Sequence, residues 1–87
     1  MHKNQIELSN DLKKTKIVVG DRYFHYKNPN QFYSVISIGF IETTEEPCVV
    51  YRGEYGENIV WIRTAKDFLS KVKLQDGSKV DRFTKVE

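Results

Sequence analysis

An apolar run at residues 32–41 limits the folds that are open to this chain. Four of its five even-numbered positions and three of its five odd-numbered positions carry a large apolar or aromatic residue. Because neighbouring side chains of a β-strand point to opposite faces of a sheet, a strand formed here is apolar on both faces. Such a strand needs cover on both sides. We therefore predict that residues 32–41 form the central strand of a sheet.

Short segments rich in β-branched and aromatic residues surround this run. They span residues 16–19, 22–27, 48–51, 59–63, 71–74 and 80–86, with turns at 20–21, 28–30 and 76–77. One helix start is also present, because Thr64 can cap a first turn and Asp67 follows three residues later. The pattern predicts a mainly β fold, either a small, strongly bent antiparallel sheet or an SH3-like barrel, with one short helix near residues 64–71.

The chain has 87 residues, a length that fits one small domain. We assign residues 16–87 to a single β-rich domain. Residues 1–15 are expected to be a loosely ordered N-terminal extension that starts a helical turn near Ser9 or covers an edge strand. A domain of this size can bury only part of a central strand that is apolar on both faces, so we expect a homo-oligomer.

Charge is unevenly distributed and disfavours general nucleic-acid binding. The net charge is +2, but residues 42–58 hold five glutamates against one arginine. This acidic middle works against a long basic groove, and the basic cluster at residues 13–16 is typical of a solvated arm. No apolar run approaches the roughly 20 residues of a membrane span, so no membrane partner is expected. The polar N-terminus and the single Cys48 predict a cytoplasmic protein.

The side chains that catalysis or metal binding would need are scarce. The chain has two histidines, one of them the near-terminal His2, and one cysteine, which is too few for a His/Cys metal cluster. No glycine-rich phosphate loop follows a strand, and Glu45 and Glu46 would point to opposite faces of one. We predict no catalytic residue, no metal and no cofactor, and hence a protein that is not an enzyme.

What remains is a set of aromatic and basic side chains suited to a flat anionic ligand, through stacking and bidentate hydrogen bonds. Four of them form two pairs whose two-residue spacing puts both members on one strand face, and two lie in or beside a loop with two glycines. As alternatives, Tyr23 and Trp61 fill the core, and Arg63 forms an ion pair with one of the middle glutamates. The candidate ligand-binding residues are Tyr23, His25, Arg52, Tyr55, Trp61 and Arg63.

A series of short motifs runs in order along most of the chain. It consists of Gly-Asp-Arg-Tyr-Phe-His-Tyr-Lys at residues 20–27, then residues 33–35, 44–47, 49–51, 55–56 and 61–63, then Phe68 and Val72. This series resembles the bacterial and phage family called domain of unknown function 1653, over about residues 16–83. The resemblance implies a compact, β-rich single domain and brings no established activity. The family often has His and Glu where this chain has Ile41 and Thr43, and Pro where it has Thr64.

Three functional hypotheses follow. The first is a non-enzymatic cytoplasmic module that binds a small anionic or nucleotide-like ligand, by analogy with small phage proteins that sequester host nucleotide signals. The second is a small-barrel domain that interacts with a protein or a nucleic acid. The third is an enzyme that uses His25 as a general base, for which the sequence offers no partner residue.

Overall fold

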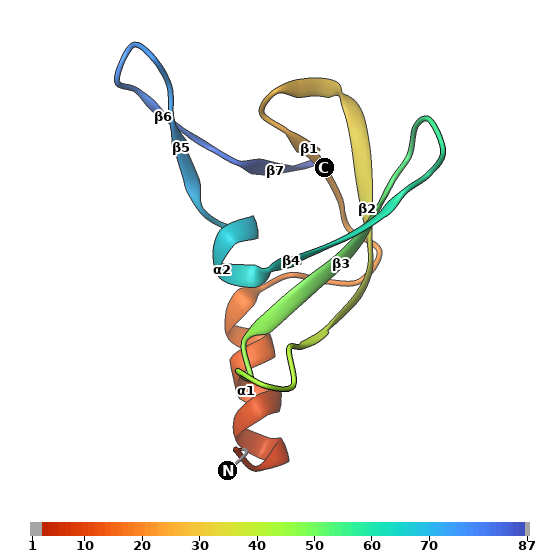
Figure 1. Ribbon diagram of the computed structural model, residues 1–87, viewed down its shortest axis with the longest axis vertical. Helices are drawn as coiled ribbons and strands as arrows, with labels where there is room; N and C mark the ends of the chain where they lie inside the picture. Colours follow the sequence, from red (N-terminus) through yellow and green to blue (C-terminus); the bar gives the residue numbers. More distant parts are fainter. Residues whose placement is uncertain (1–2, 87) are drawn as a thin grey trace.

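The computed structural model describes residues 3–86, and the mainly β fold is confirmed. Five strands form one antiparallel sheet in the order β4-β3-β2-β1-β7, and β5 and β6 form a separate hairpin. Figure 1 shows the elements, which are α1 (Gln5–Thr15), β1 (Arg22–His25), β2 (Asn28–Phe40), β3 (Pro47–Gly53), β4 (Val60–Thr64), α2 (Ala65–Phe68), β5 (Lys71–Lys73), β6 (Lys79–Asp81) and β7 (Phe83–Val86).

β2 lies in the middle of the five-stranded sheet, as its two apolar faces predicted. It has 13 residues and pairs with β1 on one side and with β3 on the other. Its register with β3 shifts between Val35 and Ser37, and the register of β1 with β2 shifts between Phe24 and His25. Irregularities of this kind bend a strand and increase its twist. The sheet therefore curls around one face.

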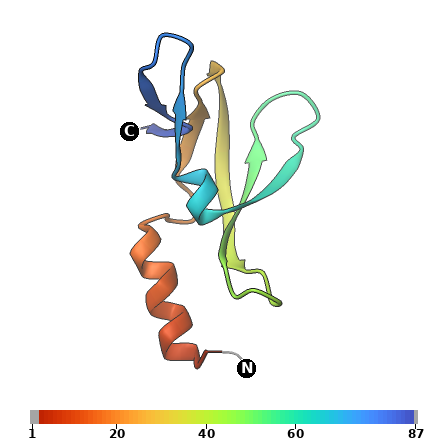
Figure 2. The same cartoon turned by 60° about the vertical axis from the view of Figure 1, so that its left-hand side comes forward.

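The curled sheet stays open, so the SH3-like barrel was wrong and the strongly bent sheet was right. The edge strands β4 and β7 approach each other through side chains, with the Arg63 guanidinium carbon 5.6 Å from the centre of the Phe83 ring. No ladder joins β4 to β7 within residues 3–86. The chain between them forms α2 and the β5–β6 hairpin, which pairs with itself and stands away from the β3–β4 hairpin (Figure 2).

The short helix α2 begins as predicted. Thr64 is its N-cap, and its side-chain oxygen accepts a hydrogen bond from the backbone N–H of Asp67 at 3.2 Å. The helix ends at Phe68, earlier than expected, because the chain enters β5 at Lys71. α2 buries Ala65 and Phe68 against the concave face of the sheet.

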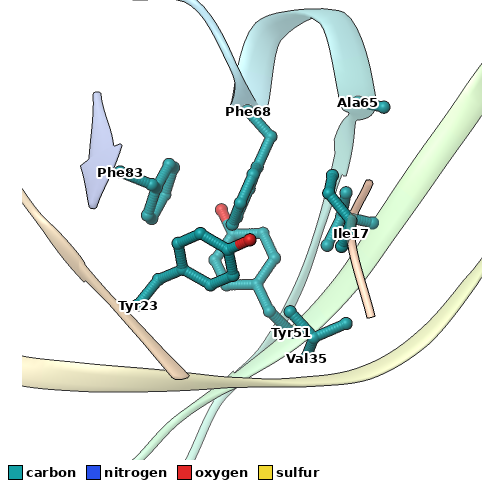
Figure 3. Close-up of a cluster of buried hydrophobic side chains, with 8 residues drawn as sticks. Ile17, Tyr23, Val35, Tyr51, Ala65, Phe68 and Phe83 are labelled. Atoms are coloured by element: carbon teal, nitrogen blue, oxygen red, sulfur yellow. The ribbon is translucent and has the colours of Figure 1, made fainter. Parts of the chain in front are cut away.

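Phe68 stands at the centre of the hydrophobic core (Figure 3). Its ring stacks on Phe83 with the centroids 4.2 Å apart, and the rings of Tyr23 and Tyr51 meet it edge-on at 4.9 and 5.4 Å. Only 1% of Phe68 is exposed. The core therefore gathers on one end of the concave face, where α2 covers the sheet.

The N-terminal extension forms a helix that the sequence had not predicted beyond a single turn. α1 begins at Gln5, because the Asn4 side chain caps it by accepting a hydrogen bond from the Glu7 backbone N–H at 2.9 Å. None of its residues is buried. The backbone N–H of Lys3 donates to the Glu45 carboxylate at 2.8 Å, which ties the start of the extension to the β2–β3 connection. That the N-terminal extension is loosely ordered stays a prediction.

Residues 16–19 do not form the predicted strand. Lys16 adopts a left-handed conformation, with φ of 60°, and ends α1 as its C-cap. Ile17 then inserts into the core, with 5% of its surface exposed, while Val18 and Val19 stay exposed. These β-branched residues thus belong to the connection between α1 and β1, which Ile17 anchors to the core.

Two predicted boundaries also differ from the structure. The turn between β1 and β2 lies at residues 26–27, whereas it was predicted at 28–30, so β2 already includes Pro29. The predicted strand at residues 80–86 is split into β6 and β7 at Arg82. The Arg82 backbone N–H donates to the Ser70 carbonyl at 3.0 Å, and this bond redirects the chain from the small hairpin back to the main sheet.

Candidate ligand-binding cavity

The end of the concave face that α2 leaves uncovered contains a cavity of about 260 Å³. The curl of the sheet brings β1 and β4 to the same cavity, although β2 and β3 separate them in the sheet order. Side chains from five strands and from the β1–β2 turn line it: His25, Lys27, Asn28, Tyr33, Tyr51, Trp61, Arg63 and Phe83.

Aromatic rings form the walls of this cavity. The ring of Tyr33 lies 5.5 Å from that of Tyr51 and 5.9 Å from that of Phe83, both edge-to-face. The Tyr33 hydroxyl is 2.6 Å from the Tyr55 hydroxyl, and burial together with this hydrogen bond raises the pKa of Tyr33 above its usual value. Phe83 is buried, whereas Trp61 keeps 47% of its surface exposed. The cavity therefore has a rigid aromatic interior and an accessible indole.

Arg63 is held in place from three directions. Its Nε donates to the Tyr51 hydroxyl at 3.3 Å, its guanidinium lies over the Phe83 ring, and its Nη1 forms an ion pair with Asp67 of α2. The ion pair was expected with a middle glutamate, and the observed partner is instead one helical turn downstream. About 30% of the Arg63 side chain stays exposed, so the fork is oriented and still accessible.

His25 lies between two aromatic rings. Its ring centroid is 4.7 Å from that of Tyr26 and 5.0 Å from that of Phe83. The Lys27 backbone N–H donates to Nδ1 at 3.2 Å, so neutral His25 carries its proton on Nε2. Burial lowers the pKa of His25, and so do the positive charges of Arg63, Arg82 and Lys27. At neutral pH this side chain is therefore an uncharged hydrogen-bond donor.

The cavity is electropositive. Lys27 and Arg63 line it, and Arg82 is near enough to act on the pKa of His25 in the same direction. The Asp67 carboxylate offsets one of these charges but is itself half exposed, at 50% of its side chain. An anion placed among these groups would be attracted, and it would also favour the protonated form of His25.

The structure brings together three of the six candidate residues, which are His25, Trp61 and Arg63. Tyr55 lies beside the cavity and reaches it through its hydroxyl contact with Tyr33. Tyr23 belongs to the core, with 7% of its surface exposed, as the alternative hypothesis of a core-filling Tyr23 had it. Arg52 is exposed on β3 at the position after Tyr51 and does not line the cavity.

Five lining residues were missed by sequence reasoning: Lys27, Asn28, Tyr33, Tyr51 and Phe83. Tyr33 and Tyr51 belong to segments that were read as strands, and alternation alone does not separate a cavity wall from a core position. Lys27 and Asn28 had been placed at the end of one strand and in a break. Their contribution follows from the tight turn at residues 26–27, which was predicted one residue or more too late.

Other chemical features are limited within residues 3–86. No group of three or more His, Cys, Asp or Glu side chains in that range could hold a metal ion, and His2 lies outside it. The thiol of Cys48 is buried, and burial raises its pKa. Neither described helix has the length and apolar character needed to cross a membrane.

The family described as "Protein of unknown function (DUF1653)" matches residues 21–85. The chain belongs to this family. The match includes every residue that lines the cavity and leaves out α1. No curated protein and no solved structure matches the chain.

Proposed function

We propose that this member of the DUF1653 family is a non-enzymatic binding protein for a small anionic ligand with an aromatic ring, such as a nucleotide. The observation that carries the proposal is the convergence of an oriented arginine, a neutral histidine donor and an accessible indole in one electropositive cavity. Aromatic planes bind a flat ring by stacking, and an arginine fork binds a carboxylate or phosphate through two parallel hydrogen bonds.

The dimensions of the cavity favour a small ligand. Its volume of about 260 Å³ lies just below the roughly 300–1,000 Å³ typical of ligand pockets. A base stacked on Trp61 with its phosphate at Arg63 would fill this space and leave the rest of the molecule in solvent. The neutral Nε2–H of His25 would supply an additional donor to an anionic oxygen.

Sequestration of a nucleotide signal, as in small phage proteins, is the role that we propose for such binding. A sequestering protein needs affinity and no turnover, and no partner carboxylate lies among the residues that line the cavity beside His25. We also propose a cytoplasmic location, which the single, buried Cys48 supports, because one cysteine cannot form a disulfide within the chain.

A thermal-shift screen with mono-, di- and cyclic nucleotides, followed by calorimetric titration, tests the proposal. At least one compound should stabilise the protein. Arg63→Ala should weaken binding on the order of a hundredfold, because the loss of a charged bidentate contact in a desolvated site costs a few kcal/mol. Arg63→Lys should recover only part of the affinity, since it keeps the charge and loses the fork. The matched control is Lys14→Ala on α1, which should bind as well as the wild type.

Two outcomes would overturn this proposal. If none of the compounds stabilises the protein, the proposed nucleotide-like ligand is wrong and the interaction-domain hypothesis is favoured. If Arg63→Ala unfolds the protein, Trp61→Ala takes its place, because the indole is half exposed and lies outside the hydrophobic core cluster. A folded Trp61→Ala variant with unchanged affinity would show that the ligand binds elsewhere.

The second candidate function, a protein-interaction domain, is favoured by a different observation. Strand β4 lies at an edge of the sheet and exposes a continuous apolar stretch at residues 59–62. Exposed apolar patches on small domains are typical of protein interfaces. This apolar stretch does not depend on the positive charge of the cavity.

A further inference from the structure

Strand β4 is an unpaired sheet edge with free backbone groups. Among the strands that the structure describes, β4 pairs with β3 alone. The backbone N–H of Gly53 donates to the Ile59 carbonyl at 3.0 Å, which makes this a hydrogen-bonded pair of the antiparallel ladder. Hydrogen-bonded and non-hydrogen-bonded pairs alternate along such a ladder. Val60 and Ile62 therefore direct their N–H and C=O groups away from β3.

The side chains of this edge are apolar on both faces. Ile59, Val60, Trp61 and Ile62 are exposed by 51%, 46%, 47% and 71% of their surfaces. Natural proteins protect sheet edges with charged residues, proline, bulges or a covering element. Residues 59–62 contain no charge and no proline, and β4 pairs with β3 without a register shift. An edge of this kind requires another strand.

We propose that β4 pairs in antiparallel fashion with β4 of a second copy, with the two-fold axis at Trp61. In this register Val60 of one copy and Ile62 of the other exchange backbone hydrogen bonds, and the same pair forms again across the axis. All the groups involved are those that point away from β3. The two five-stranded sheets become one continuous sheet of ten strands, and each edge covers the other.

The charges that flank β4 fit a second copy in this orientation. Glu57 precedes the strand and Lys66 follows it, and both are exposed. In an antiparallel pair, the start of one β4, which Glu57 precedes, lies beside the end of the other, which Lys66 follows. Parallel pairing would bring like charges together instead. The edge is thus complementary to itself in charge as well as in apolar character.

The pairing also connects the edge to the cavity. Directly opposed residues of an antiparallel pair point to the same face, so the two Trp61 side chains meet on the concave side. Trp61 already lines the cavity. The second copy would therefore place its own indole beside the cavity mouth. This inference holds whether or not the cavity binds a nucleotide, because it rests on β4 alone.

Sedimentation velocity at high micromolar concentration tests the pairing. The wild type should sediment as a species of twice its 10.2 kDa mass. Ile62→Lys should sediment as a monomer, because it adds a charge to the edge. Ile6→Lys is the matched control: Ile6 is exposed by 75%, lies on α1, and receives the same substitution. It should remain a dimer, and both variants should keep the wild-type far-ultraviolet circular dichroism, which reports the backbone fold.

Three results would overturn the proposal. These are a wild type that stays monomeric at this concentration, an Ile62→Lys variant that still dimerises, and an Ile6→Lys variant that dissociates like Ile62→Lys. Amide hydrogen exchange of the wild type tests the register. The Val60 and Ile62 amides should gain protection as concentration rises, and the Thr64 amide should not. Protection of Thr64 together with Ile62 would place the axis at Ile62 and exclude the register at Trp61.

Discussion

The two ends of the concave face of this sheet contain the same kinds of residue, but one end is covered and the other is open. At one end α2 covers the sheet, and Phe68 stacks on Phe83 and meets Tyr23 edge-on. At the other end α2 does not cover the sheet, and a cavity lined by His25 and Trp61 among others remains. A helix of four residues thus decides which aromatic rings form a core and which line a site.

The two ends share two rings, those of Tyr51 and Phe83. Phe68 packs on Phe83 from the covered end, while the Arg63 guanidinium and the His25 ring contact it from the open end. The packing of the core therefore fixes the floor of the cavity. Stability should reside mainly at the covered end and binding mainly at the open end, with Tyr51 and Phe83 as the links between them.

Truncation of the covered end should have the largest effect. Phe68 is 1% exposed and contacts three other rings, so Phe68→Ala should lower the free energy of unfolding by about 3–5 kcal/mol. Urea unfolding followed by circular dichroism measures this loss.

The matched variant at the open end is His25→Ala. This ring is partly exposed and contacts only two neighbours edge-on or tilted, so the loss should be about 1 kcal/mol. Equal losses for the two variants would contradict the division between a structural end and a binding end, and the cavity would then be part of the core.

A smaller effect on stability is expected at the N-terminus of α2. Thr64→Ala removes the N-cap of α2 and should destabilise the protein by about 1 kcal/mol. Thr64→Ser keeps the hydroxyl and serves as the control. The midpoint of thermal unfolding reports the difference, and an unchanged midpoint for Thr64→Ala would show that the cap does not hold α2 in place.

The smallest effect is a dependence on pH at the open end. The pKa of His25 is below its usual 6.5, so the unfolded chain binds a proton more readily than the folded protein does. The part of the free energy of unfolding that depends on neutral His25 should be fully present above about pH 6.5. It should decrease as pH falls from there to the lowered pKa of His25 in the folded state. A bound anion should reverse this trend, because it stabilises the charged imidazole and binds more tightly at lower pH.

Urea unfolding at pH 7.5 and at pH 5.0 checks this prediction, with His25→Gln as the reference for all other titrating groups. The wild type should lose more stability than the variant between these values. An identical loss would mean that the lowered pKa of His25 contributes nothing, and the electropositive character of the cavity would then lose its support.

Much of the architecture was readable in the sequence because its causes are local. The apolar residues on both faces of residues 32–41 identified the central strand, and Thr64 with Asp67 identified the start of α2. The family resemblance, confirmed over residues 21–85, rested on motifs that occur in order along the chain. Side-chain alternation and capping depend on neighbours within a few residues, so the sequence alone determines them.

The layer to which each aromatic residue belongs was decided only by the tertiary structure. Tyr23 and Trp61 both sit on strands, yet 7% of one and 47% of the other is exposed. Alternation gives the face of a strand, but the cover over that face comes from residues far away in the chain. The ion pair of Arg63 with Asp67 joins residues only four positions apart, and it forms because the chain turns into α2 at Thr64. Contacts between distant segments depend on how the sheet curls, and that curl arises from register shifts and packing that no local pattern encodes.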